Sequence, residues 1–145
     1  MSSEQIKFNP ENIGDCLEGR GVNFNLIGNV PEGLYSHPIS AHLDLIISEL
    51  TDNCADKGAK NVYLSFSEKS LRIEDDVVET DSQNTLKRLN GLVNESRKNL
   101  GTSGIKCDSC GGFGIFYVVS ILSKFGGNLK YSASGGHIVT ELCWN

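Results

Sequence analysis

The chain has 145 residues, of which 39% are hydrophobic and 21% are charged, and its formal net charge is −5. This length and composition are typical of one globular domain, and the negative charge argues against general affinity for nucleic acid or anionic lipid. No apolar run approaches the roughly 18 residues of a membrane helix, and the N-terminus lacks a signal-peptide pattern. We therefore expect a single cytoplasmic domain, residues 1–145, that binds neither nucleic acid nor membranes.

The first thirty residues predict a strand, preceded by a short element. Phe8 to Leu17 suits either a short helix or an edge strand, so residues 1–20 are interpreted as an N-terminal extension or edge element. The following residues alternate between apolar and asparagine side chains, which is the pattern of a half-buried strand. The apolar members of this strand are Val22, Phe24 and Leu26.

The stretch LDLIISELTDNCADKGA, residues 43–59, predicts a long helix with two distinct stripes. Pro38 suits the start of this helix and Gly58 its end. At about 100° per residue, apolar side chains form a stripe that can face a core. Its members are Leu43, Ile46, Ile47, Leu50 and Cys54. Glu49, Asn53 and Asp56 lie on a second stripe, which is either a solvated face or the rim of a pocket that holds a metal ion and a water.

Two short runs, residues 62–66 and 71–74, predict a β-hairpin joined by a polar turn. The second run ends in three consecutive acidic residues, Glu74, Asp75 and Asp76. Because their charges repel one another, we expect these carboxylates not to be fully buried. They form either a solvated strand end or part of a site that receives a hydrogen-bond donor or a cation.

The second half of the chain predicts two helices and two closing strands. Residues 80–99 suit a modest helix, capped by Asp81 or Ser82, with apolar residues at helical spacing. The segment GTSGIKCDSCGGFG, residues 101–114, has five glycines, and an amphipathic helix follows it directly. A glycine-rich loop before a helix N-terminus is typical of anion-binding sites, although a surface loop has the same composition. Cys107 and Cys110 lack partners at zinc-site spacing, so we expect no metal there.

These motifs, in this order, resemble the ATP-binding domain of sensor histidine kinases, anti-sigma-factor kinases, type II topoisomerases, mismatch-repair ATPases and ninety-kilodalton heat-shock chaperones. The resemblance covers about residues 20 to 145. It rests on ELTDNCADKGA at 49–59, IEDD at 73–76, GGFGIFYVV at 111–119 and FGGNLKYSASGGHIVTELCW at 125–144. It implies an α+β fold: a two-layer sandwich whose mixed, mostly antiparallel sheet is covered on one face by helices.

The resemblance also implies roles for individual residues and the cofactors ATP and Mg²⁺. Asn53 would bind the magnesium ion, Glu49 would orient or deprotonate the attacking group, and Asp75 would accept a hydrogen bond from the adenine amine. Further nucleotide contacts would come from the helix, the lid and the start of the second long helix. These residues are Asp56, Thr102, Ser103, Lys106, Gly111, Gly112 and Gly114.

The sequence departs from the family pattern at two positions after the acidic strand end. Val77 and Glu79 stand where glycines are usual; the valine would narrow an adenine pocket, and the glutamate would add negative charge near the phosphates. One hypothesis is therefore an ATP-dependent kinase or ATPase whose phosphoacceptor, or receiver, is another protein. The alternative is a degenerate member of the fold that serves as a docking module. A third hypothesis, which we rank last, is that the chain is a relative of the topoisomerase and mismatch-repair ATPases. Whether the chain forms a homodimer is left open.

Overall fold

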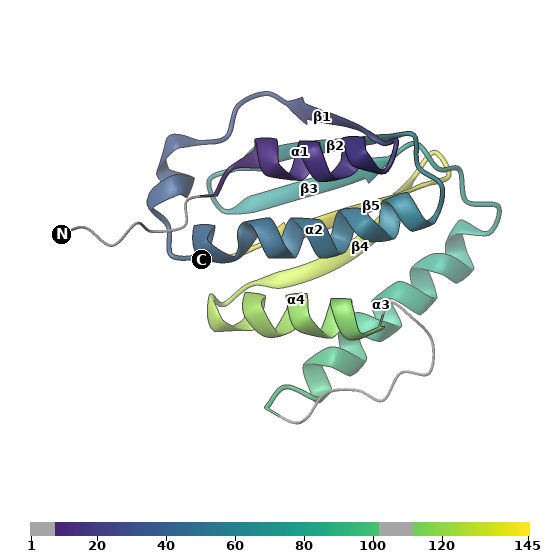
Figure 1. The fold of residues 1–145 in the computed structure, drawn as a ribbon. Helices are drawn as coiled ribbons and strands as arrows, with labels where there is room; N and C mark the ends of the chain where they lie inside the picture. The colour runs from purple at the N-terminus through teal and green to yellow at the C-terminus, as the bar shows by residue number, and fades with distance from the viewer. Residues whose placement is uncertain (1–7, 102–111) are drawn as a thin grey trace.

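The computed structural model describes residues 8–101 and 112–145. Within these ranges the chain alternates helices and strands along its length (Figure 1). The elements are α1 (Pro10–Gly19), β1 (Asn23–Ile27), the 3₁₀ helix η1 (Glu32–Ser36), α2 (Ser40–Asp56), β2 (Asn61–Ser67), β3 (Ser70–Asp75), α3 (Ser82–Lys98), α4 (Gly112–Lys124), β4 (Asn128–Ser134) and β5 (His137–Cys143).

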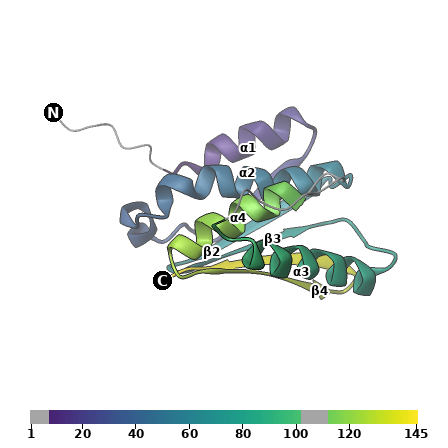
Figure 2. The ribbon, with the colours of Figure 1, turned by 90° about the horizontal axis from the view of Figure 1, so that it is seen from below.

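The strands of the described part form one sheet in the order β1-β2-β3-β5-β4. β1 runs parallel to β2, and the other neighbouring pairs are antiparallel. Figure 2 shows α1, α2 and α4 above one face of this sheet, with α3 beside β4. The predicted α+β sandwich, with a mixed, mostly antiparallel sheet and helices on one face, is confirmed.

The helix α2 lies across the middle of the sheet, between α1 and α4 (Figure 1). All five side chains of its predicted apolar stripe are buried, with at most 6% of their surface exposed. Its end is also as predicted, because Gly58 adopts a φ of +93°, a left-handed conformation that favours glycine. The apolar stripe therefore anchors the helix, which leaves the second, polar stripe beside the core.

The N-terminal element is a helix rather than an edge strand. Asn9 caps α1 by accepting a hydrogen bond from the backbone of Glu11, and Pro10 occupies the first turn, where its missing N–H costs nothing. Ile13 and Leu17 are each only 2% exposed. The helix therefore contributes side chains to the common core.

The helix α3 begins at the predicted cap, where the Asp81 carboxylate accepts from the backbone N–H of Asn84 at 3.2 Å. Its Asn90 side chain bonds both backbone groups of Tyr131 in β4, donating to the carbonyl and accepting from the N–H, each at 3.1 Å. Because β4 is the last strand of the sheet, this amide ties α3 to the sheet edge. In the described part of the chain, no helix is long and apolar enough to cross a membrane.

Candidate functional site

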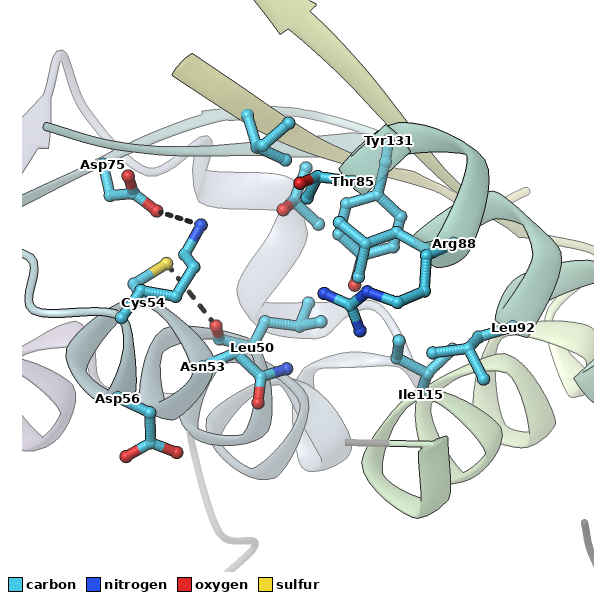
Figure 3. A pocket seen from close by; sticks show the side chains of 14 residues that line it. Leu50, Asn53, Cys54, Asp56, Asp75, Thr85, Arg88, Leu92, Ile115 and Tyr131 are labelled. Atoms are coloured by element: carbon cyan, nitrogen blue, oxygen red, sulfur yellow. Dashed lines mark hydrogen bonds and ion pairs between the residues drawn. The ribbon is translucent and has the colours of Figure 1, made fainter. Parts of the chain in front are cut away.

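A pocket of about 240 Å³ lies between α2, α3, α4 and the helix-covered face of the sheet (Figure 3). Its walls are mainly apolar, and its polar groups come from four elements and the end of α2. The lining residues are Leu50, Asn53, Cys54, Asp56, Lys57, Asp75, Thr85, Arg88, Leu89, Leu92, Ile115, Tyr131, Ile138 and Thr140. Apolar walls with a few convergent polar groups are typical of small-molecule sites.

Asp75, the last residue of β3, is the buried polar group of this pocket. Its side chain is 2% exposed, so the expectation that the acidic residues avoid burial is wrong for this one. One carboxylate oxygen, Oδ1, accepts from the backbone N–H of Val77 at 2.9 Å. The other, Oδ2, lies 3.1 Å from the ammonium Nζ of Lys57. Burial is tolerated because a cation and a hydrogen bond compensate the charge.

The other two acidic residues point elsewhere, which removes the repulsion assumed from the sequence. Glu74 faces away from the helices and accepts from Arg72 at 2.6 Å. Asp76 accepts from the backbone N–H of Lys60 and from the side chain of Asn61, each at 2.9 Å. Partial burial alone would raise the pKa of Asp76, but these hydrogen bonds lower it below its ordinary value.

Lys57 at the end of α2 contacts two carboxylates, because its Nζ also lies 3.4 Å from Oε1 of Glu79. Burial alone would lower the pKa of Lys57, but the neighbouring charges, that of Asp75 first, raise it. The negative charge of Glu79, which the sequence analysis placed near the phosphates, is therefore paired with a cation. Val77 is half-buried and packs against the core.

Cys54 and Tyr131 line the pocket as uncharged groups. Burial raises the pKa of the Cys54 thiol, and the nearby carboxylate of Asp75 raises it further. Burial likewise raises the pKa of the Tyr131 hydroxyl. The other ionisable side chains that line the pocket are two carboxylates and two cationic groups, those of Asp56, Asp75, Lys57 and Arg88.

The structure places the predicted residues of the polar stripe in three different surroundings. Asn53 is half-buried and lines the pocket, with Asp75 toward one end and Ile115 toward the other (Figure 3). Asp56 points away from these groups in Figure 3 and pairs with Arg20, the residue after α1, at 2.6 Å. Its predicted contact with a cofactor stays a prediction.

Glu49 is exposed and lies beside the first turn of α4. A Cβ added at Gly114 would stand 2.8 Å from its Oε2 atom. Glycine at this position therefore leaves the space that the Glu49 carboxylate occupies. The sequence predicted both as site residues; the structure places them against each other, and neither lines the pocket.

Most of the predicted phosphate-binding loop lies outside the described residues. This applies to Thr102, Ser103, Lys106 and Gly111, and also to the cysteine pair at 107 and 110. Gly112 is the first residue of α4, so the helix begins within the predicted loop and includes its last three residues.

Sequence reasoning missed Lys57 and Arg88 as pocket residues. No role was assigned to either residue from the sequence: Lys57 directly follows α2, and Arg88 lies on α3, whose apolar spacing was interpreted only as a helix signal. Arg88 has no ion-pair partner among residues 8–101 and 112–145, and Figure 3 shows its guanidinium directed into the pocket. A lysine directly after the polar stripe and an arginine on the neighbouring helix were the available signals.

Few side chains of the pocket region can bind a magnesium ion. The described residues contain no group of three His, Cys, Asp or Glu side chains that could hold a metal ion. Nucleotide-bound magnesium, however, takes most of its ligands from phosphates and water, and one or two protein oxygens suffice. The Asn53 amide oxygen fits this smaller requirement.

Among solved structures, histidine kinases are similar to this structure. It superposes on the blue-light activated histidine kinase EL346 of Erythrobacter litoralis with a TM-score of 0.55 and 16% identity, over 96% of this chain. The Acinetobacter baumannii histidine kinase AdeS gives a TM-score of 0.51 and 14% identity over 94% of this chain, and the mycobacterial sensor histidine kinase MprB gives 0.51 and 13% over 93%. The chain has the histidine-kinase-like fold. The fold implied by the sequence motifs is thus confirmed.

The chain with the histidine-kinase-like fold is shorter than most of these proteins. It spans 42% of the EL346 chain, 62% of the AdeS chain and 89% of the MprB chain. No protein-family model matches the sequence, and no curated protein matches it in sequence. At these identities the likeness concerns the fold alone.

Proposed function

We propose that this chain is a magnesium-dependent ATP-binding domain that acts as the catalytic part of a signalling system, with the phosphoacceptor on another protein. The observation that carries this proposal is the buried Asp75 carboxylate at one end of a largely apolar pocket, with Asn53 on the α2 wall. A planar base suits the apolar walls, and a buried carboxylate suits an exocyclic amine.

The charges of the pocket support an anionic ligand as well as a base. The Arg88 guanidinium enters the pocket without an ion-pair partner in the described part of the chain, and guanidinium groups bind phosphate oxygens well. The pairing of Glu79 with Lys57 removes a free negative charge from the same region. The Arg88 guanidinium thus favours a ligand that carries phosphate groups.

Each predicted site residue would have a distinct task. Asp75 would bind the base amine, Asn53 would supply an oxygen to magnesium, and Glu49 would orient or deprotonate the attacking group. Bound magnesium would neutralise phosphate charge and so favour phosphoryl transfer. The position of Glu49 beside the first turn of α4 leaves its carboxylate exposed and able to meet a second protein.

The test is calorimetric titration with ADP and a non-hydrolysable ATP analogue, with and without magnesium. We expect wild type to bind, and Asp75→Asn to bind about ten- to a hundredfold more weakly, because the substitution removes a hydrogen bond to a charged group. Asn53→Ala should abolish the magnesium-dependent part of the affinity. The matched controls are Asp76→Asn, which changes the adjacent carboxylate outside the pocket, and Asn94→Ala on the exposed face of α3.

Equal affinities of wild type and Asp75→Asn would remove the base-binding role. The second candidate function is a docking module without nucleotide. One observation favours it: both oxygens of Asp75 already have protein partners. If a folded wild-type sample binds no nucleotide at millimolar concentration, this second function is the better one.

A further inference from the structure

The ammonium of Lys57 occupies the part of the pocket where a base amine would bind. It lies 3.1 Å from Oδ2 of Asp75, and the Val77 N–H bonds the other oxygen. A ligand amine that approaches this carboxylate therefore meets a side chain that already donates to it. Such a contact comes from a distant part of the sequence, since Lys57 follows α2 and Asp75 ends β3.

Glu79 holds the lysine in this place from a second side. Its Oε1 atom lies 3.4 Å from the lysine Nζ and has no hydrogen-bond partner, although it is buried. The Lys57 ammonium is therefore the group that compensates both carboxylates. Moving it away from the pocket requires breaking contacts to two acids.

The Lys57 side chain can nevertheless move toward solvent. Its side chain is 31% exposed, and it follows the last residue of α2, just before Gly58, so one side of it meets solvent. The pocket of about 240 Å³ is smaller than the roughly 300–1,000 Å³ typical of small-molecule sites. Because Lys57 is one of the lining residues, its departure would enlarge the pocket at the Asp75 end.

We propose that Lys57 competes with the amine of an adenine nucleotide for the Asp75 carboxylate and so sets a low affinity for that nucleotide. The inference rests on the proposed nucleotide-binding function. It makes Lys57 a specificity residue as well. A base that carries a carbonyl oxygen in place of the amine would accept a hydrogen bond from the ammonium and would not compete with it.

The test compares ADP with inosine diphosphate, which has an oxygen where ADP has the amine, by titration of wild type and Lys57→Met. We expect Lys57→Met to bind ADP about tenfold or more tightly than wild type, which corresponds to 1.4 kcal/mol or more. Inosine diphosphate should gain nothing. Charge alone would predict that Lys57→Met binds ADP more weakly than wild type, because removing a cation weakens the attraction to phosphates.

Three further variants separate the competition from its alternatives. Lys60→Met removes an exposed lysine that does not line the pocket and should leave both affinities unchanged. Lys57→Arg keeps the cation beside Asp75 and should resemble wild type. If Lys57→Met does not fold, because Asp75 is then buried without a cation, Lys57→Gln keeps a donor and should show a smaller gain of the same sign.

The outcomes distinguish this inference from the proposed function. If wild type binds ADP and Lys57→Met binds it no more tightly, the competition is refuted and the nucleotide site stands. Equal gains for ADP and inosine diphosphate would also refute it, because the gain would not depend on the amine. If no folded variant binds either nucleotide, the proposed function fails and the competition fails with it.

Discussion

At the scale of single residues, the three consecutive carboxylates at the end of β3 illustrate how neighbours in sequence acquire different environments. Asp75 turns into the pocket and pairs with Lys57, whereas Asp76 bonds the loop after α2 through Lys60 and Asn61. A strand directs successive side chains to opposite faces, so adjacent charges separate. One carboxylate thereby serves the candidate site, and its neighbour stabilises the loop.

The lowered pKa of Asp76 makes its contribution to stability dependent on pH. The unfolded carboxyl titrates near 3.8 and the folded one below that value. The contribution is therefore fully present above pH 3.8 and is lost as pH falls through the folded pKa. We expect Asp76→Asn to lower the free energy of unfolding by about 0.5–1.5 kcal/mol at neutral pH, through the weakened hydrogen bonds to Asn61 and Lys60.

Urea unfolding of wild type and Asp76→Asn, at neutral pH and in steps below pH 4, measures this difference directly. The gap between the two proteins should narrow as the wild-type carboxyl takes up its proton. Other acidic groups affect both proteins alike, so the difference isolates this side chain. A gap that stays constant throughout the acid range would show that the charge of Asp76 contributes nothing.

At the scale of elements, α3 packs its apolar side chains against the core, and one amide ties it to the sheet edge. Asn90 makes two hydrogen bonds to the backbone of Tyr131, and α3 also supplies the Arg88 side of the pocket. Unpaired strand edges attract other strands, and this contact covers part of the β4 edge. The position of the pocket wall therefore depends on a side chain outside the pocket.

Asn90→Ala should destabilise the protein by about 1–3 kcal/mol, because the half-buried N–H and C=O of Tyr131 lose their partners. Amide hydrogen exchange should become faster at Tyr131 and along α3, while α1 and β1 keep their protection. Asn94 lies one turn further along the same helix and is exposed, so Asn94→Ala should change little. Equal effects of the two substitutions would mean that the Asn90 amide does not hold α3 in place.

At the scale of the whole molecule, α1 belongs to the same core as the rest of the domain. Leu17 and Ile13 are buried in it, and Arg20 after the helix bonds Asp52 and Asp56 of α2 at 3.0 and 2.6 Å. These ion pairs are exposed and contribute little, so the apolar contacts carry the attachment. We infer that residues 8–145 unfold as one cooperative unit.

Leu17→Ala should lower the free energy of unfolding by about 2–5 kcal/mol, because it leaves a cavity between α1 and its neighbours. Cys16→Ala changes the adjacent, exposed residue of α1 and should alter stability by no more than about 0.5 kcal/mol. Thermal unfolding followed by circular dichroism and by Trp144 fluorescence should give coincident transitions for wild type. Separate transitions, with α1 melting first, would contradict a single unit.

Much of the fold was predictable because its signals are local. The stripe of α2, the hairpin of β2 and β3 and the Asp81 cap each depend on residues a few positions apart, and helical or strand periodicity records them. For the same reason, the sequence identified Glu49, Asn53 and Asp75 as candidate site residues, of which Asn53 and Asp75 line the pocket. Their spacing relative to α2 and β3 follows from elements whose bounds it predicted.

Only the tertiary structure decided which polar and charged groups contact each other. The pairing of Lys57 with Asp75 joins residues 18 positions apart, and that of Asn90 with Tyr131 joins residues 41 apart. Neither leaves a periodic pattern, because each depends on how a helix lies across strands that come later in the chain. By contrast, the helix at residues 10–19 has local signals in its Asn9 cap and Pro10, although the sequence analysis left an edge strand open there. The sequence by itself thus determined the elements and the candidate residues, whereas long-range packing determined which residues contact them.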